Sequence, residues 1–168
     1  MALFKKWFKK RKDQNELQIQ SPLKGKAVPL TEVPDPVFSE KMMGDGAAVI
    51  PEEGRLVSPI DGEVVQLFPT NHAVGIRSGE GVEVLLHIGL ETVGMEGEGF
   101  SAHVKVGDRV KAGQSLIDFS LEKVEEKAKS TITPVVITNM DRVEKIEPVY
   151  TGESQASGET MLRVSLKE

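Results

Sequence analysis

Two of the three histidines in the chain lie in one stretch, TNHAVGIRSGEGVEVLLHIGLETV, which spans residues 70–93. His72 and His87 are fifteen residues apart, and the glycine-containing segment SGEG at residues 78–81 lies midway between them. A neutral imidazole can ligate a metal ion, attack an electrophile, or donate a hydrogen bond to a phosphate oxygen. Two imidazoles brought together could therefore do chemistry that neither does alone.

The segment between the histidines predicts a β-hairpin that brings the two rings face to face. With a turn over residues 78–81, counting back along both strands pairs His72 directly with His87. Directly opposed residues on antiparallel strands have Cβ atoms about 4.5–5.5 Å apart. Because strand side chains alternate between faces, Val74, Ile76 and Leu85 are expected on the same face as both histidines. The hairpin predicts a polar pair in apolar surroundings.

Three interpretations of the pair stay open from the residues alone. The two histidines could be unrelated, with one in the core and one on the surface. They could be two ligands of a zinc ion, in which case His103 or an acid such as Glu91 would have to complete the set. They could serve phosphoryl transfer, one as the nucleophile and the other as a donor to the phosphate oxygens.

The elements that must position the pair are predicted to be short strands. Apolar runs rich in Val and Ile are broken by Gly, Pro and Asp about every 8–12 residues, which is typical of an all-β antiparallel sandwich or flattened barrel. The segment SLEKVEEKAKS at residues 120–130 is rich in helix formers and predicts one brief helix. The segment at residues 33–46, which holds two prolines, predicts a loop with a short helical turn.

The first residues have a different pattern. Residues 1–12 hold six basic side chains and no acid, and four apolar side chains recur there at helical spacing: Leu3, Phe4, Trp7 and Phe8. This pattern predicts an N-terminal amphipathic helix that makes weak contact with an anionic membrane surface through residues 3–12; a solubilising tail is the alternative. We therefore expect a basic segment over residues 1–16 and one domain over residues 17–168.

Composition excludes several classes of function. Outside the first twelve residues the chain carries 15 basic and 26 acidic side chains, a net charge of −11, so phosphate repulsion opposes nucleic-acid binding and a basic or apolar protein partner is favoured. The absence of cysteine excludes disulfides, a cysteine nucleophile and thiolate metal sites. The sequence shows neither a membrane-spanning run nor a signal peptide, so we expect a cytoplasmic protein, peripheral at the inner face of the plasma membrane through its N-terminus.

Six motifs occur in one order and spacing that matches a known family. They are SPIDGEVVQLFPTNHAVGI, VEVLLHIGLETV, GEGF, VKVGDRVKAGQSLIDF, VEEKAKS and TPVVITNMD. From about Pro22 to the C-terminus the chain resembles enzyme IIA of the glucose family in the bacterial phosphoenolpyruvate:sugar phosphotransferase system. The resemblance implies a sandwich of the duplicated hybrid-motif type and a phosphoryl carrier in sugar uptake.

The resemblance also implies roles for single residues. His87 would be phosphorylated on Nε2, His72 would steady the phosphoryl group and pass it on, and Thr70 would orient the His72 ring. Because Nε2 of His87 must be unprotonated to attack, its Nδ1 is expected to donate to a backbone carbonyl. Phospho-HPr would be the donor and a cysteine on an enzyme IIB domain the acceptor, with no cofactor required.

A partner-binding surface around the histidines follows from the same resemblance. It would consist of Val37, Phe38, Met42, Met43, Phe68, Val74, Leu85 and Glu91. Glu91 stands where the family commonly has Asp, and Leu85 where an aromatic residue is often found, so both should alter the fit to a partner. A zinc ion bridging His72 and His87 is also expected in a complex whose partner supplies a carboxylate.

Two other functions compete with the carrier. One is a zinc-dependent peptidase of the lysostaphin type, which shares a related barrel but uses a paired His-x-His that this sequence lacks. The other is a purely regulatory binding module that senses phosphorylation through the same histidines. The residues alone do not separate a carrier from a protein with regulatory targets.

Overall fold

The computed structural model describes residues 15–168, in which the chain forms an antiparallel all-β sandwich with few helices. The strands are β1 Glu16–Gln20, β2 Gly25–Pro29, β3 Asp45–Pro51, β4 Arg55–Val57, β5 Gly62–Leu67, β6 Ala73–Ser78, β7 Glu83–His87, β8 Phe100–Ala102, β9 Arg109–Val110, β10 Ser115–Phe119, β11 Thr133–Ile137, β12 Val143–Pro148, β13 Ser154–Gln155 and β14 Thr160–Leu166. The α-helices are α2 Pro36–Ser39 and α3 Leu121–Lys127, and the 3-10 helices are η1 Leu30–Glu32, η2 Thr92–Met95 and η3 Met140–Arg142.

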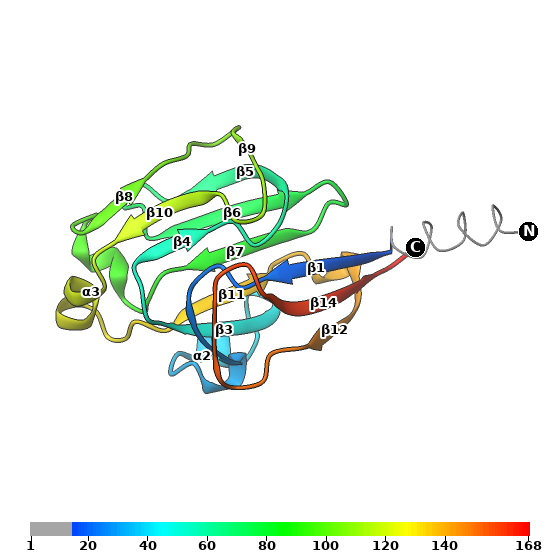
Figure 1. Cartoon of the computed structure of the whole chain (residues 1–168), viewed down its shortest axis with the longest axis horizontal. Helices are drawn as coiled ribbons and strands as arrows, with labels where there is room; N and C mark the ends of the chain where they lie inside the picture. The colour runs from blue at the N-terminus through cyan, green and yellow to red at the C-terminus, as the bar shows by residue number, and fades with distance from the viewer. Residues whose placement is uncertain (1–14) are drawn as a thin grey trace, which may run out of the picture.

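The strands form one large sheet and two small ones. The large sheet has the order β13-β2-β3-β11-β7-β6-β5-β9, and the small sheets have the orders β4-β10-β8 and β1-β14-β12 (Figure 1). Every strand pair within residues 15–168 is antiparallel. The end strands β13 and β9 of the large sheet are not paired with each other, so this sheet stays open. The predicted all-β sandwich is confirmed, and a closed barrel is not formed in the described part.

Both predicted helical segments are present. α3 lies within residues 120–130, where Ser120 caps it by accepting a hydrogen bond from the Lys123 amide. α2 lies within residues 33–46 and begins with Pro36 directly after its cap Asp35. The predicted amphipathic helix at residues 3–12 lies outside the described residues. Among the helices of residues 15–168, none has both the length and the hydropathy that a membrane-spanning helix requires.

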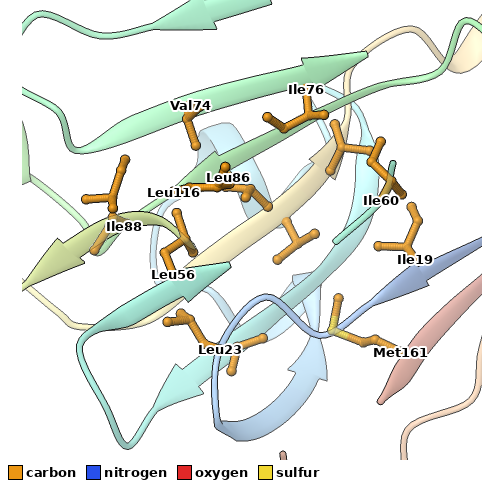
Figure 2. Close-up of a cluster of buried hydrophobic side chains, with 14 of the residues drawn as sticks. Ile19, Leu23, Leu56, Ile60, Val74, Ile76, Leu86, Ile88, Leu116 and Met161 are labelled. Carbon is orange, nitrogen blue, oxygen red and sulfur yellow. The ribbon is translucent and has the colours of Figure 1, made fainter. Parts of the chain in front are cut away.

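The main core lies between the large sheet and the small sheets. Figure 2 shows Val74, Ile76 and Leu86 from β6 and β7 gathered in one cluster with Leu56 of β4 and Leu116 of β10. All five side chains are fully buried. Complete burial of a side chain of this size stabilises a fold by about 1.5–3 kcal/mol, so this layer fixes the β6–β7 hairpin firmly on the rest of the molecule.

A second, smaller apolar cluster covers the other face of the large sheet. Its members come from the sheet and from the segments around it: Val28, Leu30, Val33, Phe38, Ala48, Leu90, Ile132 and Val136. Phe38 of α2 is only 4% exposed, so this short helix is fixed by burial of its one aromatic side chain. The cluster thereby fixes α2 on the face of the sheet to which His87 also belongs.

The β6–β7 hairpin has a register that differs by one residue from the predicted one. Ala73 rather than His72 is opposite His87, and Gly75 rather than Val74 is opposite Leu85. The loop has three residues instead of four, because the Ser78 amide donates to the Val82 carbonyl oxygen at 2.8 Å. Three-residue hairpin loops need a left-handed residue at their end, and Gly81 supplies it with φ of 90°.

The corrected register changes which side chains accompany the histidines. Leu85 does share the face of His87, as predicted, because the two residues alternate on one strand. Val74 and Ile76 point to the opposite face and belong to the main core, so the prediction that they lie beside the histidines was wrong.

Candidate active site

The two histidine rings meet at the end of the hairpin although the residues are not directly opposed. His72 precedes β6, and its carbonyl oxygen accepts from the Ile88 amide at 2.8 Å. Asn71, with φ of 58°, lies in a bend that takes His72 out of the regular pleat of the strand. The ring centroids of His72 and His87 are 5.0 Å apart, with an angle of 78° between the planes. The predicted convergence of the pair is therefore confirmed, by a bend rather than by cross-strand pairing.

His87 is oriented by the main chain that follows it. Its Nδ1 is 2.8 Å from the Gly89 carbonyl oxygen, which can only accept a hydrogen bond, so Nδ1 carries the proton and Nε2 carries the lone pair. This bond to a backbone carbonyl was predicted. Burial lowers the pKa of His87 below its usual value, although the Gly89 bond and the charge of Asp35 act in the opposite direction. The ring is therefore neutral near pH 7.

His72 is more deeply buried than His87, with 2% exposure. Its Nδ1 is hydrogen-bonded to the hydroxyl of Thr70, the contact that was expected to orient this ring. Burial, and secondly the neighbouring His87, lower the pKa of His72 from 6.5 to about 4. In both rings Nδ1 is occupied by an orienting bond, which leaves Nε2 of each for other interactions.

Two phenylalanines flank the imidazole pair. The ring of Phe38 lies 5.3 Å from that of His87, and the ring of Phe68 lies 5.2 Å from that of His72, both measured between centroids. The four rings form a continuous series in the order Phe38, His87, His72, Phe68. Tilted and edge-on arrangements at these distances are favourable for aromatic pairs and restrict rotation of the imidazoles.

The residues expected in the partner-binding surface differ widely in exposure. Val37 is 39% exposed, Met42 70% and Met43 38%, so three large apolar side chains are open to solvent on α2 and in the four residues after it. Glu91 is exposed as well. Phe38 and Leu85 are almost buried, at 4% and 5%, and Phe68 is half-buried.

Val74 does not belong to this surface. It is fully buried in the main core, on the far side of the sheet from His87. It was assigned to the surface from the family resemblance, and the register of β6 and β7 places its side chain on the opposite face of the sheet.

Two residues of the site were not identified from the sequence. Asp35 caps α2 by accepting from the Val37 amide at 3.0 Å, and its charge acts on His87. An Asp directly before a Pro is a recognisable helix start and could have located it. Gly89 provides the acceptor for His87 with φ of 69°, a conformation that the sequence IGLE gives no means of predicting.

The residues around the pair do not form a complete metal site. Within residues 15–168 no third His, Cys, Asp or Glu joins His72 and His87 in a group that could hold a metal ion. His103, one of the suggested additional ligands, instead bonds through Nε2 to Asp118 Oδ2 at 2.8 Å on the surface. A zinc-dependent peptidase site would need a third protein ligand that this part of the chain does not offer.

Protonation of buried His72 is expected to destabilise the fold as the pH falls. Its pKa is 6.5 in the unfolded chain and about 4 in the folded one, so the unfolded chain takes up the proton first. The stability contributed by neutral His72 is complete above pH 6.5 and is lost as the pH falls toward 4, by on the order of 3 kcal/mol. Urea unfolding of the wild type and of His72→Gln over this pH range measures the difference. Free energies of unfolding that run parallel in the two proteins would contradict this expectation.

The comparisons with known proteins agree with this geometry. The sequence matches the family model described as phosphoenolpyruvate-dependent sugar phosphotransferase system, EIIA 1, over residues 17–143. The glucose-specific EIIA component of the phosphotransferase system of Bacillus cereus is 54% identical over 166 residues, which cover 98% of this chain and 100% of that protein. The protein of the same name from Staphylococcus epidermidis is 46% identical over 159 residues, which cover 91% of this chain and 96% of that protein.

A solved structure shares the fold. Glucose permease IIA from Mycoplasma capricolum superimposes with a TM-score of 0.80 at 35% sequence identity, and the match covers 88% of this chain and 95% of that one. The family match spans more than half of the chain and includes both histidines, Thr70 and Gly89. The chain therefore belongs to the EIIA 1 family of the phosphoenolpyruvate-dependent sugar phosphotransferase system, as a phosphoryl carrier for sugar uptake.

Proposed function

We propose that this EIIA component carries its phosphoryl group on Nε2 of His87, accepting it from phospho-HPr and passing it to a cysteine of an enzyme IIB domain of a glucose-family transporter. The observation that carries the proposal is the hydrogen bond from Nδ1 of His87 to the Gly89 carbonyl oxygen at 2.8 Å. It leaves the nucleophilic lone pair on Nε2, beside a second imidazole 5.0 Å away between centroids.

The transfer needs little beyond positioning and charge stabilisation. The lone pair of Nε2 attacks phosphorus, the bond from phosphorus to HPr breaks, and HPr keeps that electron pair. In the second step the thiolate of the IIB cysteine attacks phosphorus, and the electron pair of the P–N bond returns to His87. The bonds made and broken balance in both steps without an additional reactant.

His72 stabilises the negative charge of the phosphoryl group during transfer. If the Thr70 hydroxyl donates to Nδ1 of His72, the proton of that neutral ring is on Nε2, from which it can donate to a phosphoryl oxygen. Such a donor is more effective in a buried site than in water. The charge of the phosphoryl group would also raise the pKa of His72 from its low value, which strengthens the same hydrogen bond.

The partner-binding surface would consist of the exposed apolar side chains on and after α2 together with the exposed carboxylate of Glu91. Val37, Met42 and Met43 provide flexible apolar area that two different partners can contact in turn. The negative charge of residues 13–168 favours a donor that is basic at its docking surface. Closure of this surface by a partner would exclude water from the phosphoryl group during transfer.

Three further expectations belong to this proposal. The protein would act in the cytoplasm, where weak contact of residues 3–12 with the inner face of the plasma membrane would bring it close to its acceptor. No cofactor is required for the transfer. A zinc ion could bridge His72 and His87 only when a partner supplies a carboxylate, and a regulatory target could dock on the same surface.

The test is phosphorylation of the intact chain. After incubation with phosphoenolpyruvate, enzyme I and HPr, intact mass should show one added phosphoryl group that is lost in acid and retained in base. Phosphorus NMR of the product should identify an Nε2-phosphohistidine. An unmodified chain, with all three components active on another acceptor, would contradict the proposal; an Nδ1-phosphohistidine would contradict the assignment of the atom.

A further inference from the structure

One peptide group close to His87 is held at both of its polar ends by threonine hydroxyls. This is the peptide that joins Ile88 to Gly89. Thr92 Oγ1 donates to the Ile88 carbonyl oxygen at 2.7 Å, and the Gly89 amide donates to Thr133 Oγ1 at 3.4 Å. Thr92 is the first residue of η2 and Thr133 the first residue of β11, so two separate elements are hydrogen-bonded to the same peptide.

Both threonines are fully buried, with 0% exposure. The hydroxyl proton of Thr133 goes to the Thr131 carbonyl oxygen at 3.0 Å, which leaves a lone pair on Oγ1 for the Gly89 amide. A buried hydroxyl that loses its partner is left without water to replace it. Rotation of the Ile88–Gly89 peptide would break both threonine bonds at once, and the burial of the hydroxyls opposes that rotation.

The orientation of this peptide determines where the acceptor of His87 lies. Rotation of the peptide plane changes ψ of Ile88 and φ of Gly89 together, and φ of Gly89 is 69°. The following carbonyl, that of Gly89, moves with this φ. Its oxygen is the acceptor for Nδ1 of His87 at 2.8 Å.

The neighbouring main chain completes the support on either side of this peptide. The Ile88 amide donates to the His72 carbonyl oxygen at 2.8 Å, and the Leu90 amide donates to the Ser130 carbonyl oxygen at 2.9 Å. These bonds fix the two ends of the segment, whereas the threonines fix the plane between them. The segment that follows the nucleophile is thus constrained by three parts of the fold that lie far apart in sequence.

We propose that Thr92 and Thr133 are positioning residues for phosphoryl transfer, which hold the Gly89 carbonyl against Nδ1 of His87 and so keep Nε2 free of a proton. The inference rests on the proposed role of His87 as nucleophile. Neither threonine contacts the phosphoryl group. Each acts through the peptide that it holds, and the effect appears in the tautomer of the His87 ring.

Nitrogen-15 NMR of the neutral His87 ring tests the proposal directly. The wild type should show one tautomer, protonated on Nδ1. In Thr92→Val and Thr133→Val, which keep the shape of the side chain without its hydroxyl, the tautomer protonated on Nε2 should become populated. The rate of phosphoryl uptake should fall by about tenfold, as expected when an orienting hydrogen bond is lost. Thr92→Ser and Thr133→Ser, which keep the hydroxyl, should restore both the tautomer and the rate.

Ser58→Ala provides the matched control, because the Ser58 hydroxyl is also buried and donates to the Ile60 carbonyl oxygen at 2.7 Å. This variant should lose stability while the His87 tautomer and the uptake rate stay as in the wild type. If the valine variants behave in the same way, the threonines are structural only and the proposal is overturned. The two proposals can also fail separately. If the His87 tautomer changes in the valine variants but the wild type accepts no phosphoryl group, the positioning role is supported and the carrier role is contradicted.

A second measurement needs no substitution and covers the case in which a valine variant fails to fold. In the wild type the hydroxyl proton of Thr92 and the amide proton of Gly89, which make the two bonds between this peptide and the threonines, should give resolved NMR signals, since both threonines are buried. Their exchange with water should be slow. Fast exchange of the Thr92 hydroxyl proton or of the Gly89 amide proton would show that the peptide is not held in this way and would overturn the proposal.

Discussion

Replacement of His87 by glutamine is expected to abolish phosphoryl uptake while the fold is retained. Glutamine has no nucleophilic ring nitrogen, and the His87 side chain is only half-buried, so its loss costs little packing. His72→Gln should still be phosphorylated on His87, but its transfer to enzyme IIB should fall by about a hundredfold or more, because glutamine, although it has an N–H donor, cannot become positively charged beside the phosphoryl group as an imidazole can. Intact mass measures the uptake, and loss of the phosphoryl group on mixing with the IIB domain measures the onward transfer.

His103→Gln is the matched control for both substitutions. His103 lies on the surface after β8, bonded to Asp118, and takes no part in the imidazole pair. The His103→Gln variant should accept the phosphoryl group and pass it to enzyme IIB at wild-type rates. Uptake by His87→Gln at the wild-type rate would place the nucleophile on another residue, and His72→Gln that donates at the wild-type rate would remove His72 from the transfer.

The sequence allowed the convergence of the histidines to be predicted but not the way it is achieved. SGEG between two apolar runs specifies a hairpin, yet it fits a four-residue loop as well as the three-residue loop that forms. A shift of one residue exchanges the two faces of a strand, which is why Val74 and Ile76 were wrongly predicted to lie beside the histidines while Leu85 was placed correctly beside His87. Register depends on core packing and on the conformation of Gly81, and a local pattern contains neither.

Local signals predicted α2 and α3, because helix-forming composition and prolines act within a few residues. The hydrogen bond between Thr133 and the segment after His87 was not predictable from local signals. Thr133 meets Gly89 across 44 positions of sequence, and a threonine at the start of an apolar run looks like any other strand residue. The groups that do the chemistry could be identified from the sequence, whereas the contact of Thr133 with the segment after His87 becomes visible only when β11 lies beside β7.

Gly89→Ala is expected to be the most destabilising small substitution at the site. A Cβ on Gly89 would lie 2.8 Å from both the Ser130 carbonyl oxygen and Thr92 Cγ2. Neither neighbour can move freely, because Ser130 O accepts from the Leu90 amide and Thr92 is fully buried. The left-handed conformation costs alanine about 1–2 kcal/mol, and crowding in a packed interior adds about 1–3 kcal/mol. The free energy of unfolding should therefore fall by about 2–5 kcal/mol, measured by urea denaturation.

Gly113→Ala separates the two contributions to this loss. Gly113 has φ of 89°, similar to that of Gly89, but a Cβ there would meet no atom within 4 Å, so only the backbone cost applies. The free energy of unfolding of Gly113→Ala should fall by about 1–2 kcal/mol, and any larger fall in Gly89→Ala measures the crowding at Gly89. Equal losses in the two variants would mean that the loop after His87 can shift to accept a methyl group. A loop that yields in this way could not hold the Gly89 carbonyl against Nδ1, so a larger loss at Gly89 is what an orienting role for this segment requires.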